Sequence, residues 1–294
     1  MKELKVLAVV VALTLITYWG VEPFAHSQMH PHVDAADFKF KDLKEDVADV
    51  TSLKGNATAG EALVTANCTA CHSIKTKGYP EIMDHASSAA AYGVTPPDLG
   101  SAGKLYDASY LAAFIKNPAK ASQVEHKFVD GRTHPMPGYD WMQPQEIADM
   151  VAYLQSIAPE EMSNKEVFTD ACQRCHSIKY ADMQKGTMAA FTPDDNIKAY
   201  MGKLPPDLSQ HIKSRGHEYL ETFINKPQKH LEGTAMPRVG LNEESQAQVI
   251  TYLEEVGDSS KKQREELGPK FLIYLVIFAI FAILWKKSKW RDVH

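Results

Sequence analysis

Two short motifs carry the residue types with the clearest chemistry. Residues 68–72 read Cys-Thr-Ala-Cys-His, and residues 172–176 read Cys-Gln-Arg-Cys-His. Cys-x-x-Cys-His is the attachment signature for c-type haem. One helical turn brings both thiols under the porphyrin edge, where they bond to two vinyl groups, and the adjacent imidazole points toward the iron. The expected attachment residues are Cys68, Cys71, His72, Cys172, Cys175 and His176.

Two other interpretations of the cysteines are weaker. A zinc site built from two cysteine pairs would leave the adjacent histidine of both motifs unexplained. A thioredoxin-like redox motif requires a βαβ context, which the sequence lacks. All four cysteines of the chain belong to these two motifs. We therefore expect two covalently bound haem c groups, with His72 and His176 as iron ligands.

A methionine is the expected second iron ligand in each half. Met136 lies in the sequence His134-Pro-Met-Pro-Gly-Tyr139, and Met236 lies in Ala-Met-Pro-Arg. A methionine usually fills a core, but these two alone occupy equivalent repeat positions followed by proline. Methionine ligation raises the potential of a haem relative to two histidines. Alternatives stay open: they are Met142, His134 or His126 for the first haem and His217 or His230 for the second.

The soluble part of the chain is an internal duplication. Besides the cysteine motif, four landmarks recur in the same order, which predicts two copies of one module of about 100 residues that meet near Pro159. The recurring pairs are Pro96–Leu99 with Pro205–Leu208, Leu111–Pro118 with Leu220–Pro227, Met136-Pro137 with Met236-Pro237, and Ala152–Leu154 with Thr251–Leu253.

The elements that position these residues are predicted to be helices. Apolar spacing of three and four residues marks the helices, and no alternating run suggests a sheet. We therefore expect an all-α fold, with an irregular loop near residues 76–96. The predicted helices are 59–67 and 164–171 before the cysteine motifs, 110–117 and 219–226 ending at prolines, and 145–157 and 243–256 closing each copy.

Composition bounds the class of protein. The chain has 294 residues, 44% of them hydrophobic, which suits two domains and excludes a mainly disordered chain. With 32 basic and 37 acidic residues the net charge is −5, so no nucleic-acid partner is expected.

Both ends of the chain are apolar. Residues 6–21 form an uncharged run after Lys2 and Lys5, either a signal peptide cleaved near Ala25-His26-Ser27 or, as we favour, a retained anchor ending in Tyr18 and Trp19. Residues 271–285 form a second run, followed by a basic cluster. Positive-inside logic places both termini in the cytoplasm, with the modules on the periplasmic side of the inner membrane.

Residues 55–257 resemble the class I cytochrome c family, in two tandem domains. The resemblance implies that the carbonyl oxygen of Pro97 or Pro206 accepts a hydrogen bond from the Nδ1 of the proximal histidine, which fixes the imidazole ring. It also implies a helix crossing through Gly60 and Tyr153. The second module departs from this pattern, because Asn164 stands where glycine is expected opposite Tyr252, so a looser crossing is expected there.

The whole chain resembles the membrane-bound di-haem cytochrome c subunit of a bacterial quinol–cytochrome c reductase (cytochrome bc) complex. The opening Met-Lys-Glu-Leu-Lys, residues 20–32 and the C-terminal anchor carry this likeness. It implies one-electron transfer from an iron–sulfur protein to a cytochrome c or an oxidase, beside a cytochrome b subunit and membrane lipid, with no catalytic residue of its own. The alternatives are a subunit of a haem–copper oxidase and a di-haem peroxidase. The expected division is 1–27 (anchor), 28–158 and 159–262 (cytochrome domains), and 263–294 (C-terminal anchor and basic tail).

Overall fold

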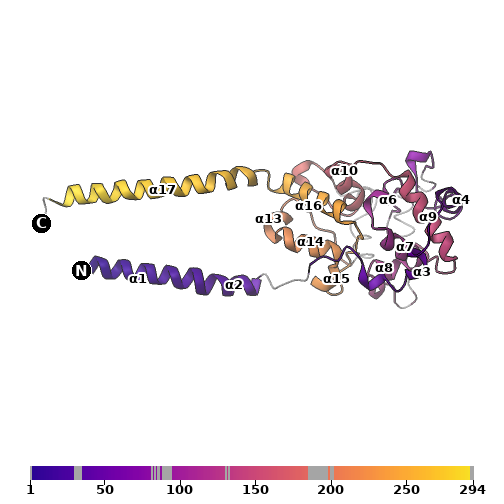
Figure 1. Cartoon of the computed structure of the whole chain (residues 1–294), viewed down its shortest axis with the longest axis horizontal. Helices are drawn as coiled ribbons and strands as arrows, with labels where there is room; N and C mark the ends of the chain where they lie inside the picture. Colours follow the sequence, from indigo (N-terminus) through magenta and orange to yellow (C-terminus); the bar gives the residue numbers. More distant parts are fainter. Residues whose placement is uncertain are drawn as a thin grey trace. The chain divides into compact units, whose positions relative to one another are not determined.

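A computed structural model describes residues 2–29, 35–80, 82, 84, 87, 95–129, 131, 133–184, 198 and 202–291. The chain divides into two units, residues 1–36 and 37–294 (Figure 1). The loop expected near residues 76–96 lies largely outside the described residues. Where the chain is described, isolated β-bridges form but no strand, so the prediction of an all-α fold is confirmed.

The first unit is a long apolar helix. It consists of α1 (Lys2–Ile16), a π-helical turn (Thr17–Val21) and α2 (Glu22–Met29). Pro23 cannot donate a backbone hydrogen bond, and the wider π turn just before it accommodates that loss. The stretch Leu4–Met29 has 26 residues and a mean hydropathy of 2.0. The helix therefore continues beyond the apolar run that the sequence marks.

The first module of the second unit is built from short helices around one core. They are α3 (Ala48–Thr51), α4 (Ala57–Asn67), α6 (Ala102–Leu105), α7 (Ala108–Lys116), α8 (Pro118–Ala121) and α9 (Pro144–Ile157). Side chains cap the helices that matter most for the site: Asn56 accepts hydrogen bonds from two amides of α4, and Asp107 does the same for α7. Pro118 both ends α7 and begins α8, because proline is tolerated at the first helical position.

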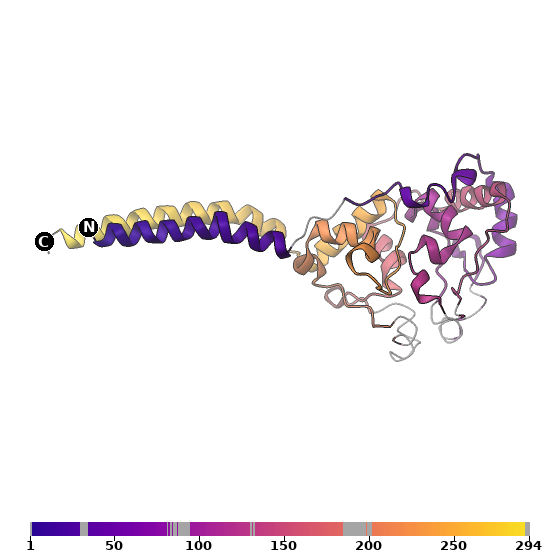
Figure 2. The same cartoon turned by 90° about the horizontal axis from the view of Figure 1, so that it is seen from below.

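The second module repeats this order. Its elements are α10 (Asn164–Phe168), a π-helical turn (Thr169–Gln173), α13 (His211–Arg215), α14 (His217–Asn225), α15 (Pro227–His230) and α16 (Glu243–Gly257). Figure 2 shows the two modules as separate groups of helices. The helix expected over 164–171 is shorter than predicted, because it widens into the π turn at Thr169 before the cysteine motif.

The crossing of α4 and α9 depends on a glycine. A Cβ atom on Gly60 would lie 1.9 Å from the backbone oxygen of Asp149 and 2.9 Å from Cβ of Tyr153. No other residue permits this approach, so the crossing implied by the family resemblance is present. In the second module Asn164 is the first residue of α10, and its Nδ2 donates to Oε1 of Glu255 at 2.9 Å. A hydrogen bond to the side chain of α16 stands there in place of close backbone packing.

The two modules share their packing. Leu105 of the first module is buried in the core of the second. Tyr106 and Leu241 form an antiparallel bridge, flanked by backbone hydrogen bonds that join Asp107 to Gly240 (3.1 Å) and Asn242 to Leu105 (3.0 Å). The segment just after Met236 therefore lies directly against the first module.

A segment before the modules, residues 37–51, contacts both of them. Phe40, Leu43, Val47 and Val50 are buried in the core of the first module. At its start, the Asp37 amide donates to Oδ1 of Asn225 in the second module at 3.0 Å. Residues 37–51 thus connect the two modules, through apolar packing with the first and a hydrogen bond to the second.

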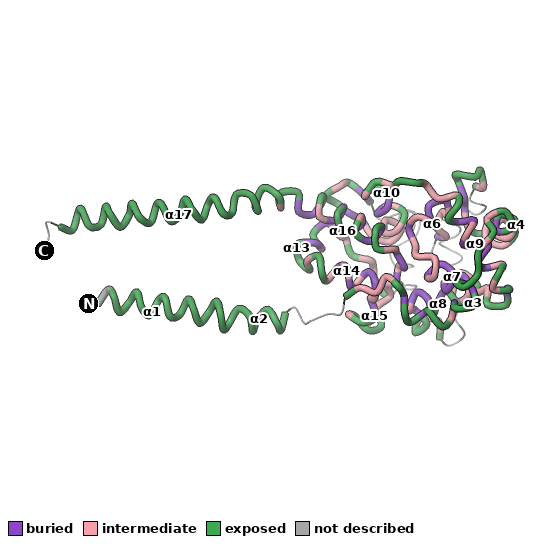
Figure 3. The backbone as a smooth tube through the Cα atoms, in the orientation of Figure 1, coloured by how far each residue is buried: buried purple, intermediate pink, exposed green. Residues whose placement is uncertain are grey.

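The chain ends in a second long apolar helix, α17 (Lys261–Trp290), of 30 residues and mean hydropathy 2.3. Figure 3 shows α1, α2 and α17 exposed along almost their whole lengths, whereas the buried residues of the described chain lie between Phe40 and Asp258. Asp258 anchors the start of α17 through a bidentate ion pair with Arg264 at 2.6 and 2.8 Å. The charged stretch before the apolar run is consequently helical from Lys261.

Candidate functional site

The first cysteine motif is a turn at the end of α4. Cys68 terminates the helix, and the amides of Cys71 and His72 both donate to its carbonyl oxygen, at 3.1 and 2.9 Å. Cys172 accepts the same two bonds from Cys175 and His176, at 3.1 and 3.0 Å. The two turns are closed alike, and no disulfide joins their four thiols.

Each proximal histidine is held by a proline carbonyl. Nδ1 of His72 lies 2.8 Å from the oxygen of Pro97, and Nδ1 of His176 lies 2.9 Å from the oxygen of Pro206. A carbonyl oxygen only accepts, so Nδ1 carries the proton and Nε2 presents its lone pair. Burial lowers the pKa of both imidazoles, which favours the neutral form that binds a metal. Both proline contacts implied by the family resemblance are present.

An aspartate after each proline pair fixes the backbone beyond the histidine. Oδ2 of Asp98 accepts from the Ser73 hydroxyl at 2.6 Å and from the Lys75 amide at 3.0 Å. In the second module, Oδ2 of Asp207 accepts from Ser177 at 2.7 Å and from the Lys179 amide at 3.0 Å. Burial would raise the pKa of Asp207, but hydrogen bonds led by that from Ser209 bring it down to about 2.

Sequence reasoning did not assign a role to this serine–aspartate pair. The signal was available, because Ser73 and Asp98 recur as Ser177 and Asp207 within the repeated landmarks. A backbone hydrogen bond joins the same segments. The amide of Leu99 donates to the backbone oxygen of Ser73 at 2.9 Å, and the amide of Leu208 donates to the backbone oxygen of Ser177 at the same distance. The histidine and the proline segment are therefore locked together in both modules.

The donor set suits haem c better than a cysteine-bound metal. Burial raises the pKa of Cys68 and of Cys172 to about 12, which favours neutral sulfur, and a thioether sulfur is neutral. All four cysteines are described, and among the described residues no group of three or more His, Cys, Asp or Glu is placed to hold a metal ion. The zinc interpretation fails on this point. Two thiols and an imidazole with a free Nε2 on one turn fit a covalently attached haem.

The two methionines lie on similarly supported loops. The Met136 amide donates to Nδ1 of His134 at 3.1 Å, and the Met236 amide donates to Oγ1 of Thr234 at 3.3 Å. Each bond is made by the residue two positions before the methionine. The hydroxyl of Tyr139 donates to the Asn67 oxygen at 2.9 Å, which joins the Met136 loop to the residue preceding Cys68.

In the second module the contact between the methionine loop and the cysteine motif is apolar, since Met236 and Cys172 pack against the same core. Ligation by either methionine stays a prediction.

The rival ligands occupy different surroundings. Met142 is buried in the first core and serves as packing. His134 is engaged with the backbone of Met136 itself. His217 is exposed and lies 3.9 Å from Glu221. His230 packs edge-on against Tyr219 and Phe223, and its buried Nε2 has no hydrogen-bond partner among the described residues.

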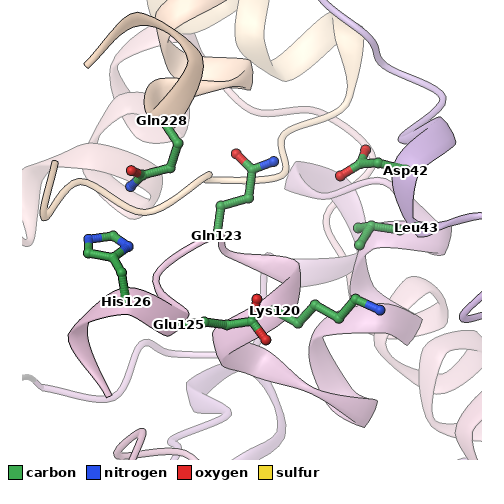
Figure 4. A pocket seen from close by; sticks show the side chains of 7 residues that line it. All are labelled: Asp42, Leu43, Lys120, Gln123, Glu125, His126 and Gln228. Atoms are coloured by element: carbon green, nitrogen blue, oxygen red, sulfur yellow. The ribbon is translucent and has the colours of Figure 1, made fainter. Parts of the chain in front are cut away.

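One open cavity of about 510 Å³ lies apart from the cysteine motifs. Figure 4 shows side chains from both modules and from the 37–51 segment around it, among them His126, Gln123 and Gln228. None of its lining residues belongs to a cysteine motif or to a proline or methionine landmark. His126 is exposed on its rim, away from those elements.

Comparison with known proteins decides the family. The sequence model of cytochrome c matches residues 57–158 and again residues 164–257, together more than half of the chain. The chain belongs to the cytochrome c family. Cytochrome c domains bind haem c covalently, and electron transfer is their function. The prediction of two tandem cytochrome c domains is thereby confirmed.

A relative and a solved structure add detail. A "Cytochrome c-553-like" protein of Synechocystis sp. is 29% identical over 120 residues, which are 41% of this chain and 87% of that protein. A structure titled "Hyperthermophilic respiratory Complex III" covers 97% of this chain and 99% of its own, at 20% identity and a TM-score of 0.32. The family assignment rests on the match to both modules.

Proposed function

We propose that this cytochrome c is the di-haem electron-transfer subunit of a quinol–cytochrome c reductase complex. The observation that carries the proposal is that the same arrangement around a proximal histidine, here called the proximal frame, occurs twice. It is found at His72 and at His176, in two modules that pack together. Each frame comprises the cysteine turn, the imidazole held by a proline and the serine–aspartate pair. Two apolar helices of membrane-spanning length flank the pair of modules in the sequence.

Each motif residue has a distinct part in holding haem c. The thiols of Cys68 and Cys71, and of Cys172 and Cys175, would form the thioethers, and Nε2 of each histidine would bind the iron. Met136 and Met236 are the proposed further iron ligands. Bound haem supplies reversible one-electron chemistry between ferric and ferrous iron. The chain itself fixes the imidazoles, so little rearrangement of the protein accompanies each electron.

The two apolar helices are the proposed membrane anchors. At 1.5 Å per residue, Leu4–Met29 measures about 39 Å and α17 about 45 Å, against a hydrocarbon core of about 30 Å. Lys286, Lys287 and Lys289 follow the apolar part of α17, so its end faces the cytoplasm. An even number of crossings then puts both termini in the cytoplasm, with the modules on the periplasmic face of the inner membrane. The four-part division at residues 27, 158 and 262 belongs to this proposal.

The proposed partners follow from the sequence resemblance. An iron–sulfur protein delivers single electrons, a cytochrome b subunit accompanies the anchors in the lipid, and a cytochrome c or oxidase accepts the electrons. A carrier is favoured over a peroxidase because a peroxidase needs an open iron, whereas both modules present a methionine on a supported loop.

The test is rapid mixing of quinol with the complex purified from native membranes, with and without an inhibitor of quinol oxidation. We expect cytochrome b and an iron–sulfur protein to copurify, and haem c reduction to stop with the inhibitor. Reduction that ignores the inhibitor would overturn the assignment. Copurification with a haem–copper core would favour the oxidase alternative, and rapid turnover of hydrogen peroxide by the isolated chain would favour the peroxidase.

A further inference from the structure

Arg174 reaches from the second cysteine motif to the first module. It stands between Cys172 and Cys175, where the first motif has Ala70. Its Nη1 donates to the backbone oxygen of Thr95 at 3.0 Å. Thr95 precedes, by two residues, the proline whose carbonyl holds His72. The guanidinium is therefore hydrogen-bonded to the segment that positions the proximal histidine of the other module.

The surroundings of Arg174 are buried and polar. Nε of Arg174 and Oγ1 of Thr95 are both buried without a hydrogen-bond partner among the described residues. A second bond between the modules runs from the Ser101 hydroxyl of the first to Oδ2 of Asp170 in the second, at 2.6 Å. A buried donor without a partner costs free energy, since its lost hydration is not fully replaced.

The charge of Arg174 acts on both motifs. Arg174 stands two residues before His176 in the sequence. Its bond to Thr95 also places the guanidinium beside the segment whose Pro97 oxygen holds His72. At the first motif, Ala70 supplies no such charge.

We propose that Arg174 links the two haem sites, by holding the Thr95–Pro97 segment against the second motif and by favouring the reduced state at both irons. This inference rests on the proposed function, because it requires haem at each motif. Reduction adds one electron to each ferric iron and gives ferrous iron, with no bond made or broken. The positive charge of the site falls by one, and a neighbouring cation favours that change. Arg174 is thus a positioning and charge-bearing residue.

The test is an optical redox titration of the full-length chain in detergent, with dithionite as reductant. Arg174→Gln is compared with Arg174→Lys and with Arg215→Gln, which removes an exposed cation from α13 of the same module. In Arg174→Gln we expect both one-electron steps to move down, with the ferrous-to-ferric ratio at fixed potential reduced about tenfold, or about 59 mV. In Arg174→Lys both midpoint potentials should stay close to their wild-type values. In Arg215→Gln at least one of the two steps should keep its wild-type potential.

Movement of only one step, or of neither, in an Arg174→Gln chain that carries two haems would overturn the inference and leave the proposed function standing. A lysine variant shifted as far as the glutamine variant would refute the role of charge. If Arg174→Gln fails to mature, Arg174→Met keeps the aliphatic packing and answers the same question. A wild-type chain with fewer than two haems would instead defeat the proposed function.

Discussion

Replacing Asp207 by asparagine tests the frame behind His176. The aspartate accepts hydrogen bonds from the Ser177 hydroxyl (2.7 Å), the Lys179 amide (3.0 Å) and the Ser209 amide (3.1 Å). The first two reach the same oxygen, Oδ2. An asparagine keeps one acceptor oxygen and turns the other into a donor, so it leaves the Lys179 amide facing another donor.

The expected loss of stability is about 2 kcal/mol. The pKa of about 2, against an ordinary value of 3.8, corresponds to about 2.4 kcal/mol without screening. The carboxylate is partly exposed, so screening reduces this to about 1 kcal/mol. An amide left unsatisfied adds about 1 kcal/mol. For a unit of this size, the sum lowers the melting temperature by about 4–8 °C.

Thermal unfolding of the full-length chain, followed by circular dichroism at neutral pH, measures the loss. Asp98→Asn is the matched variant in the first module, and Asp182→Asn is an exposed control at a left-handed position that asparagine tolerates well. The folded pKa of Asp207 is depressed, so the contribution of its charge is present above pH 3.8 and lost as the pH falls through about 2. Equal melting temperatures for wild type and Asp207→Asn at pH 7, or a gap that widens toward pH 2, would refute the reasoning.

Three further outcomes follow from the structure. Met136→His should lower the potential of one haem and weaken the near-infrared band of methionine ligation, leaving the part that belongs to Met236, and an unchanged titration and spectrum would exclude Met136 as ligand. Gly60→Ala should cost about 3 kcal/mol or prevent assembly of the first module, because the new Cβ meets the Asp149 oxygen; a normal melting curve would show that α4 and α9 separate freely. Arg238→Met should destabilise the joined modules by about 1–3 kcal/mol in chemical denaturation, since Arg238 is buried and pairs with Asp42 at 2.7 Å, and an unaltered midpoint would show that this pair contributes nothing.

Much of the fold was predictable because its signals are local. The helices over 145–157 and 243–256 agree with α9 and α16 within a residue, since an amphipathic repeat and a capping residue define them. The start of α10 was also predicted, but its change to a π turn at Thr169 was not, because nothing in the sequence signals that widening. The hydrogen bonds from the proximal histidines to Pro97 and Pro206 were predictable from the family resemblance.

Packing between distant segments was not predictable. Phe40, Leu43 and Val47 are spaced by three and four residues, as on one face of a helix, but the sequence does not say against which elements that face packs, and the structure places it in the first core. Arg238 follows Met236-Pro237, and nothing in its local sequence indicates burial, but it is buried in the module interface, over the ring of Phe40. Spacing along a chain carries no signal for such partners.

The haem content of the purified chain tests the central claim most directly. Pyridine haemochrome analysis, normalised to protein by amino-acid analysis, counts covalently bound haem per chain after extraction of any loose haem. The account predicts two for the wild type, and one each for Cys71→Ala and Cys175→Ala. A wild-type value of one or zero would contradict it.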